Sequence, residues 1–257
     1  MNLLLLRDED FLPDGTLLLT GRRARHAREV LNAARGDTLR VGRVGGRIGT
    51  GEILHADAQE VRLRAHLDQE PPPRAKVDVL LALPRPKALK KVLPALASLG
   101  VDRVVLVNAA RVEKSYFGSH AVEPDSVTRL LELGLEQARD TVLPQVLLRD
   151  RFRPFVEDEL DAVFGLGKHR WLAHPLAESD ASRLPRPSPS DRVVAAIGPE
   201  GGWVPFEVKL LESRGFRAFS LGPRILRVET AVPLVLGQIA LARQIGDGES
   251  SRQRERS

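Results

Sequence analysis

The 257-residue sequence contains no cysteine. This absence excludes disulfide bonds, a thiolate nucleophile and thiolate metal ligands. The six histidines are scattered and none forms a pair at metal-ligand spacing, so no metal site is expected. No apolar run approaches the roughly 18 residues of a membrane-spanning helix, and the run at residues 3–6 is too short for a signal-peptide core. We therefore expect a cytoplasmic protein without a membrane segment.

Apolar residues make up 42% of the sequence, enough for a sizeable core in one large or two ordinary domains. The formal net charge is +5, and it is unevenly distributed. Residues 1–70 carry eleven basic and eleven acidic side chains, whereas residues 71–118 carry nine basic and three acidic ones. The second region could bind a polyanion such as RNA, although a charge run is also the ordinary pattern of a solvated helix face.

Short strands separated by glycine and aspartate dominate the first 70 residues. Alternating residues at 38–41, 47–55 and 61–66 predict antiparallel strands, and residues 22–31 predict a short helix. A small β-barrel with one helix is the simplest assembly of these elements. The helix carries four arginines that could bind RNA phosphates or simply remain solvated: Arg22, Arg23, Arg25 and Arg28.

Three consecutive prolines at residues 71–73 mark a domain boundary, because proline removes a backbone donor and fixes φ. We assign residues 1–70 to the first domain, 71–76 to a linker, 77–245 to a second domain and 246–257 to a polar, disordered tail. In the second domain, an apolar run at 77–83, a helix and a strand at 104–107 form a βαβ unit, which implies a parallel sheet.

The helix of this unit has two distinct faces. One face carries apolar residues at core spacing: Leu89, Val92, Leu93, Leu96 and Leu99. The other carries Lys87, Lys90 and Lys91, and Arg85 lies just before the helix. These four basic residues are candidates for RNA binding.

The remaining pattern continues the alternation of helices and strands. A helix at 126–139 should turn its leucines inward, Leu130, Leu131, Leu133 and Leu135 among them, and leave Glu132, Glu136 and Gln137 outside. Strands are expected at 169–174, 192–197 and 218–221, with a helix at 205–213. Pro233 fits only the first turn of a helix, so the last helix should run from Glu229 or Thr230 to about Gln244.

Two loops lie where apolar runs end and helices begin, which is where open α/β sheets bind ligands. The first reads Gly198-Pro199-Glu200-Gly201-Gly202-Trp203, and its glycines allow a ligand to approach the backbone closely. The second reads Leu221-Gly222-Pro223-Arg224-Ile225-Leu226-Arg227-Val228-Glu229-Thr230-Ala231. Neither fits the dinucleotide or triphosphate motifs of other nucleotide-binding folds. Taken alone, the first loop is an ordinary turn, but the charged groups of the second favour a ligand site.

These paired loops closely resemble the RsmE family, the ribosomal small-subunit RNA uridine N3-methyltransferases of the SPOUT class. The resemblance continues through Leu99-Gly100-Val101-Asp102-Arg103, through Glu136-Gln137 followed by Pro144, and through His26 to Leu31 with Gly36-Asp37 in the first domain. It covers nearly the whole chain to about residue 244.

The resemblance implies an α/β fold: a SPOUT methyltransferase domain with a parallel sheet and a C-terminal trefoil knot, preceded by a small PUA-like RNA-binding β-barrel. It also implies a homodimer, S-adenosyl-L-methionine as cofactor, and 16S ribosomal RNA of the small ribosomal subunit as substrate. The cofactor would contact the strand end at Leu172, Ala173 and His174, and both loops. In the loops the implied residues are Gly198, Pro199, Glu200, Gly201, Gly202, Leu221, Gly222, Ile225 and Leu226.

Methylation of a uridine N3 requires that its proton leaves as the methyl group arrives, and negative charge spreads onto the flanking carbonyl oxygens. An arginine can stabilise that charge, and we assign this role to Arg227 with Arg224 in support. Glu229 is a candidate base or partner of the arginine. The alternatives are salt bridges from the arginines to Glu200 or Glu229, and an ordinary acidic residue in the first turn of a helix for Glu229.

Two neighbouring residues have structural interpretations. We expect His174 to anchor backbone and Trp203 to pack under the first loop.

The chain also departs from the family pattern. The usual Gln-Lys-Ala-Thr-Glu-Leu-Gly is Pro94-Ala95-Leu96-Ala97-Ser98-Leu99-Gly100 here, and the usual Glu-Gln-Ser-Gly-Arg is Glu136-Gln137-Ala138-Arg139-Asp140. These changes leave the target nucleotide open. The displaced Arg139–Asp140 pair also leaves open a non-catalytic RNA-binding or ribosome assembly factor that retains the knotted fold. A second alternative is a small-molecule α/β enzyme that uses the glycine-rich loops to bind a nucleotide.

Overall fold

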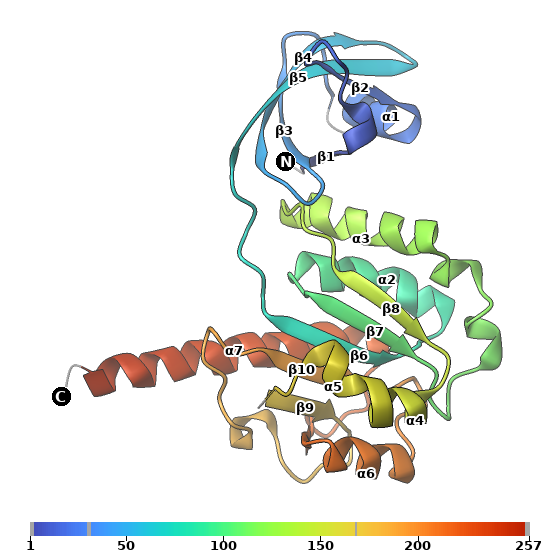
Figure 1. Ribbon diagram of the computed structural model, residues 1–257, viewed down its shortest axis with the longest axis vertical. Coiled ribbons are helices and arrows are strands. Elements are labelled where there is room, and N and C mark those ends of the chain that lie inside the picture. Colours follow the sequence, from blue (N-terminus) through green and yellow to red (C-terminus); the bar gives the residue numbers. More distant parts are fainter. Residues whose placement is uncertain (1–2, 30–31, 168, 255–257) are drawn as a thin grey trace. The chain divides into compact units, whose positions relative to one another are not determined.

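The structure is a computed structural model that describes residues 3–29, 32–167 and 169–254, with backbone alone from residue 246 onward (Figure 1). The chain divides into two compact units. Unit 1 comprises Met1–Pro73 together with Leu131–Leu143, and unit 2 comprises Arg74–Leu130 together with Pro144–Ser257. Among the described residues, no helix has the length and apolar character needed to cross a membrane.

Unit 1 contains one five-stranded sheet and the helix α1 (Gly21–Glu29). Its strands follow the order β1-β3-β4-β5-β2, in which only the β1–β3 pair is parallel. Their bounds are β1 Leu4–Leu6, β2 Leu17–Thr20, β3 Thr38–Arg43, β4 Ile48–Ala56 and β5 Glu60–Gln69. The predicted strands and helix of this region are confirmed, whereas β1 and β2 were not predicted. The predicted end of the helix at residues 30 and 31 lies outside the described residues.

Alternating burial explains the sheet of unit 1. Leu39, Val41, Val61 and Leu63 point into an apolar core that α1 completes with Ala24 and Ala27, while the intervening residues are more exposed. Gly49 lies at a bulge between β4 and β5, where a Cβ would come within 1.8 Å of the His66 carbonyl oxygen. Only glycine fits there.

The helix α3 (Pro124–Ala138) corrects one prediction of exposure. Glu132 and Glu136 were expected outside, but both are buried within unit 1, and Leu133 is 41% exposed. Glu132 accepts hydrogen bonds from the Arg7 guanidinium, with Nη2–Oε1 at 2.7 Å and Nε–Oε1 at 3.1 Å. The periodicity of the helix could not reveal an arginine partner 125 positions earlier in the sequence.

Unit 2 is built on a six-stranded, wholly parallel sheet of order β11-β9-β10-β6-β7-β8. This confirms the parallel sheet. The strands are β6 Val77–Ala82, β7 Arg103–Val107, β8 Gln145–Arg149, β9 His169–Ala173, β10 Val193–Ile197 and β11 Phe216–Phe219. Every residue of β6 and β10 is buried, so both strands are mainly apolar in sequence, and Asp78 is the one charged residue in them.

The helices of unit 2 follow the strands in alternation (Figure 1). They are α2 Pro86–Ser98, the part of α3 up to Leu130, α4 Phe152–Pro154, α5 Leu160–Phe164, α6 Pro205–Ser213 and α7 Val228–Arg254, with a π-helical turn at Phe155–Glu159. Leu89, Val92, Leu93 and Leu96 of α2 are buried as predicted. Leu99 is not: it follows the last turn of α2 and is 43% exposed.

Helix α7 runs further than the sequence predicts. It begins at Val228, so Pro233 falls in its second turn, and it continues to Arg254 rather than ending near Gln244. No later proline stops it, and Glu249, Gln253 and Arg254 are favourable helix formers. The last three residues, 255–257, lie outside the described part of the chain.

Candidate functional site

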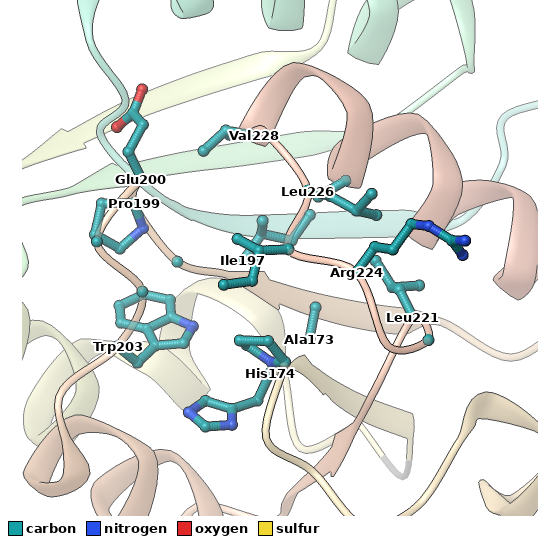
Figure 2. Close-up of a pocket in the computed structure, with 17 residues that line it drawn as sticks. Ala173, His174, Ile197, Pro199, Glu200, Trp203, Leu221, Arg224, Leu226 and Val228 are labelled. Atoms are coloured by element: carbon teal, nitrogen blue, oxygen red, sulfur yellow. The ribbon is translucent and has the colours of Figure 1, made fainter.

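A pocket lies in unit 2 where β9, β10 and β11 end. Because these strands are parallel and adjacent, the segments that follow them meet at one edge of the sheet. The pocket is a cavity of about 190 Å³ with an open mouth. Figure 2 shows side chains from all three segments around this space.

Most side chains that line the pocket are apolar. They come from the end of β9 and the residues after it (Ala173, His174, Pro175), from the first loop (Ile197, Gly198, Pro199, Glu200, Gly201, Gly202, Trp203) and from the second (Leu221, Gly222, Arg224, Ile225, Leu226, Val228, Ala231). An apolar lining with a few polar groups is usual for a small-molecule site, in which the polar groups orient the ligand.

The first loop is tightly packed on itself and on a neighbouring loop. A Cβ at Gly198 would lie 3.2 Å from the Trp203 backbone nitrogen, so any other residue there would require Trp203 to shift by a few tenths of an ångström. Gly202 has φ +72, a left-handed conformation that favours glycine. Arg111, in the segment after β7, donates a hydrogen bond from Nη1 to the Gly201 carbonyl oxygen.

Trp203 forms part of the pocket wall. It is 4% exposed and packs against Phe152 with ring centroids 5.4 Å apart, which confirms that it packs beneath the loop. Its indole Nε1 is buried and has no hydrogen-bond partner among the described residues. A buried donor without a partner on the wall of a pocket is a candidate contact for a ligand.

Glu207 fixes the end of the first loop. Its buried carboxylate accepts the backbone N–H of Val204 at 2.9 Å, which caps helix α6, and the backbone N–H of Ala110 at 2.7 Å. One carboxylate thus ties the segment after β10 to the segment after β7. Sequence reasoning missed this residue, although Glu at the third position of a helix is a capping signal.

The second loop presents its arginines differently. Gly222 has φ +110 and allows the turn after β11. Arg224 lines the pocket, and its guanidinium extends away from Trp203 (Figure 2). Arg227 is exposed and is not part of the pocket wall. Ile225 lines the mouth with 88% of its surface exposed.

The two acidic residues near the pocket have basic partners other than these arginines. The Glu200 carboxylate accepts the backbone N–H of Arg85 at 3.2 Å, and its Oε1 lies 3.7 Å from Arg85 Nε. Glu229 Oε1 lies 3.7 Å from Lys91 Nζ on helix α2. Glu200 and Glu229 were the salt-bridge partners considered for Arg224 and Arg227. In the structure they pair with Arg85 and Lys91.

His174 anchors backbone, as predicted. Its Nδ1 accepts the N–H of Leu176 at 3.2 Å, and its own backbone N–H donates to Phe219 O at 3.0 Å. Burial lowers the pKa of His174, although the Glu212 carboxylate opposes that shift. The ring is therefore neutral at physiological pH, as an acceptor nitrogen must be.

The structure brings together the residues that the family resemblance implied for cofactor binding, with one exception. Leu172 is fully buried within β9 and does not line the pocket. Additional lining residues that the sequence analysis did not assign to the cofactor are Pro175, Ile197, Trp203, Val228 and Ala231. Ile197 ends β10 directly before the first loop, and Val228 belongs to the second loop, so their position was a usable signal.

The arginines of α1 fall into two groups. Arg22 and Arg25 are exposed and remain available to a partner. Arg23 forms a two-pronged ion pair with Asp10, which is 2% exposed, with Arg23 Nη2–Asp10 Oδ1 at 2.6 Å. Arg28 donates to the Asp57 carbonyl oxygen at 2.9 Å. Arg23 therefore serves unit 1 structurally.

The altered family motif after α3 also has a structural role. Arg139 adopts φ +57 and ends the helix, and the Asp140 N–H returns to Leu135 O at 3.1 Å, as in a helix-terminating Schellman turn. The Asp140 carboxylate then accepts the backbone N–H groups of Thr141 at 2.6 Å and Val142 at 3.0 Å. The acid that stands in the family's arginine position shapes this turn.

Within the described ranges, no group of three or more histidine, aspartate or glutamate side chains is arranged to hold a metal ion.

Comparison with known proteins shows that the chain is similar to RNA methyltransferases. Ribosomal RNA small subunit methyltransferase E of Treponema pallidum is 29% identical over 238 residues, covering 90% of this chain and 87% of that protein. The protein of the same name from Synechocystis is 28% identical, covering 88% and 73%. The solved structure of ribosomal RNA small subunit methyltransferase E from Neisseria gonorrhoeae bound to S-adenosyl methionine has the same fold, with a TM-score of 0.73 at 21% identity and coverage of 92% and 95%.

A family model described as the RNA methyltransferase domain matches residues 70–240 of this sequence, which is most of the chain. The chain therefore belongs to the RNA methyltransferase domain family.

Proposed function

We propose that this protein transfers a methyl group from S-adenosylmethionine to N3 of a uridine in 16S ribosomal RNA. The observation that carries the proposal is the pocket formed by the two loops that resemble the RsmE family, in a chain of the RNA methyltransferase domain family. The Treponema and Synechocystis relatives carry the name of a small-subunit rRNA methyltransferase. A ribosomal substrate implies a cytoplasmic location.

The pocket residues suit S-adenosylmethionine. Ala173, Ile197, Leu221 and Leu226 provide apolar surface for an adenine ring, and Gly198 lets the ring approach the backbone. The buried Trp203 Nε1 offers the ligand a hydrogen-bond donor. The chemistry supplied by bound S-adenosylmethionine is an electrophilic methyl group whose carbon–sulfur bond electrons stay on sulfur.

The residues beside the pocket would manage the charge and the proton of the uridine. As the N3–H bond breaks, its electron pair forms the new N3–carbon bond, and negative charge spreads onto the two adjacent carbonyl oxygens. Arg227, supported by Arg224, would donate hydrogen bonds to those oxygens. Glu229 is the candidate acceptor of that proton: a hydrogen bond from its own backbone N–H lowers its pKa, so the carboxylate is ionised at neutral pH.

Two finer features of the fold belong to this proposal. We assign unit 1 as a PUA-like RNA-binding domain, on the support of its small mixed sheet and the exposed Arg22 and Arg25. We also assign a trefoil knot to the C-terminal part of unit 2, on the support of the paired loops that enter one pocket. Both features follow the family resemblance.

We further assign a homodimer, whose support lies on helix α7. Leu234, Leu241 and Ile245 are spaced by seven and four residues, so they form one stripe, and they are 38%, 49% and 42% exposed. An exposed leucine–isoleucine stripe on a long helix suits a second copy of the chain.

The proposed activity can be tested directly. Small ribosomal subunits from a strain that lacks the gene are incubated with the purified protein and S-adenosylmethionine, and the RNA is mapped by mass spectrometry. One new N3-methyluridine is expected. No cofactor binding by calorimetry would instead favour the RNA-binding assembly factor, and cofactor binding without RNA methylation would favour a small-molecule enzyme.

Arg227 is the sharpest single-residue test. R227A should lower kcat by about a hundredfold to a thousandfold, the loss seen when one donor to a developing oxyanion is removed. Affinity for S-adenosylmethionine should change by less than about threefold, because Arg227 does not line the pocket. R217A removes an exposed arginine from β11 and serves as the matched control. Normal turnover in R227A would eliminate the proposed role.

A further inference from the structure

Three residues on the wall of the pocket have side chains that can carry a charge: His174, Glu200 and Arg224. They differ in whether the chain itself supplies a partner. Burial lowers the pKa of His174, so its ring is neutral at physiological pH, and its Nδ1 accepts the backbone N–H of Leu176. The Glu200 carboxylate faces the Arg85 guanidinium, with Oε1 and Nε 3.7 Å apart. Two of the three therefore have their partners within unit 2.

Arg224 is the third of these residues, and it has no such partner. It is exposed, and its guanidinium forms no ion pair or hydrogen bond within the described residues. Figure 2 shows the guanidinium on the side of Leu221 and Leu226, away from Trp203. The pocket wall thus presents a positive charge that solvent and a ligand can both reach, and that the described part of the chain leaves without a carboxylate.

The charges of S-adenosylmethionine determine which of its groups can meet this cation. The sulfonium and the α-amino group are both positive at neutral pH, so the α-carboxylate is the one negative group of the molecule. A guanidinium donates two parallel hydrogen bonds to a carboxylate, and such charge-assisted bonds are stronger than bonds between neutral groups. Arg224 is therefore complementary to the carboxylate and repels the other two charged groups.

We propose that Arg224 binds the α-carboxylate of S-adenosylmethionine and selects for a cofactor with a complete amino-acid tail. This inference rests on the proposed function and narrows it, since it assigns Arg224 to the cofactor and leaves the uridine oxygens to Arg227. The positions of the two arginines agree with this division, because Arg224 lines the pocket and Arg227 does not.

Decarboxylated S-adenosylmethionine isolates this contact, because it keeps the adenosine, the sulfonium and the amine and lacks only the carboxylate. In calorimetry, the wild-type protein should bind it at least about tenfold more weakly than S-adenosylmethionine. R224A should weaken the binding of S-adenosylmethionine by about tenfold to a hundredfold, the contribution of a hydrogen bond between charged groups. Its affinity for the decarboxylated compound should stay within about threefold of wild type.

Two further variants serve as controls. R217A removes the same charge from an exposed position on β11 outside the pocket wall, and it should bind both compounds as the wild type does. R224K keeps the charge but not the planar fork, so it should retain part of the preference for the carboxylate. A loss of folded protein in R224A would reduce binding of both compounds alike and would lower the melting temperature.

The outcomes separate this inference from the proposed function. Equal weakening of both compounds by R224A overturns the inference, because the arginine would then only shape the loop. Unchanged cofactor affinity with weaker RNA binding or slower methylation also overturns it, and would place Arg224 on the RNA. A wild-type protein that shows the expected preference but does not methylate small subunits supports the inference and overturns the proposed function. A wild-type protein that does not bind S-adenosylmethionine overturns both.

Discussion

The two tryptophans offer a direct probe of the pocket at the scale of single residues. Trp171 and Trp203 are both buried, and the indole Nε1 of each has no partner in the described part of the chain. Only Trp203 lines the pocket, whereas Trp171 packs against Phe219 within the sheet, with ring centroids 5.5 Å apart. The same chemical group is therefore present at the candidate site and away from it.

This pair makes a matched fluorescence experiment possible. In W171F, addition of S-adenosylmethionine should change the emission of Trp203, whereas W203F should give no response. W203F should also weaken binding by about twofold to tenfold, the value of one hydrogen bond. A response that persists in W203F would show that the ligand binds elsewhere.

Individual site residues were predictable only where local sequence determines the geometry. The glycines at 198 and 202 were identifiable, because a tight turn after a buried strand needs them. The ion pair of Arg23 was not predictable, since its partner Asp10 lies in an earlier turn and no periodicity links the two residues. The pairing of Glu229 with Lys91 could not be foreseen at all, because it depends on how α2 and α7 pack.

Strands, like single residues, were predictable only where their own sequence carries a clear pattern. Strands β6 and β10 lie in the middle of the parallel sheet, so their apolar runs predicted them well. Strand β8 is at the edge of that sheet and only partly buried, and its sequence carries neither a continuous apolar run nor strict alternation. Strand β1 has three residues, too few for periodicity to show.

The exposed lysines of helix α2 allow a test of whether this helix binds RNA. Lys87 and Lys90 are exposed, so the double charge reversal K87E/K90E should weaken binding to small-subunit RNA and flatten the dependence of affinity on salt, by about one unit of slope per lost phosphate contact. K209E/R217E reverses two exposed charges on α6 and β11 and is the control. Equal affinity and slope in both variants would make the α2 lysines an ordinary solvated face.

At the scale of the whole molecule, the apolar stripe on α7 determines what is expected in solution. The chain has a mass of 28.3 kDa, and light scattering should report twice that value for a homodimer. L241E places a charge in the stripe and should give the monomer mass. L166E alters an equally apolar residue that is 86% exposed in the segment after α5, and it should leave the mass unchanged. A monomeric wild-type protein would contradict the dimer.

The fold class was predictable from the alternation of strands and helices, but the division of the chain into units was not. The prolines at 71–73 are a visible boundary, and the first contiguous segment of unit 1 does end at Pro73. Nothing in the pattern of residues 131–143 separates them from the rest of α3. Their grouping with unit 1 depends on side chains such as Arg7, whose partner no local rule identifies.

The grouping of residues 131–143 with unit 1 limits how the gene can be divided or recombined. Unit 1 is completed by a segment encoded far downstream, through the Leu3 N–H to Glu136 O bond at 2.9 Å, the Arg7–Glu132 pair and the Gly45 N–H to Thr141 O bond at 2.7 Å. A gene fragment that stops after the prolines would encode all five strands and still omit these partners. Unit 1 is therefore not encoded by one contiguous segment. An exchange between related genes would have to carry both segments or preserve the pairs that join them.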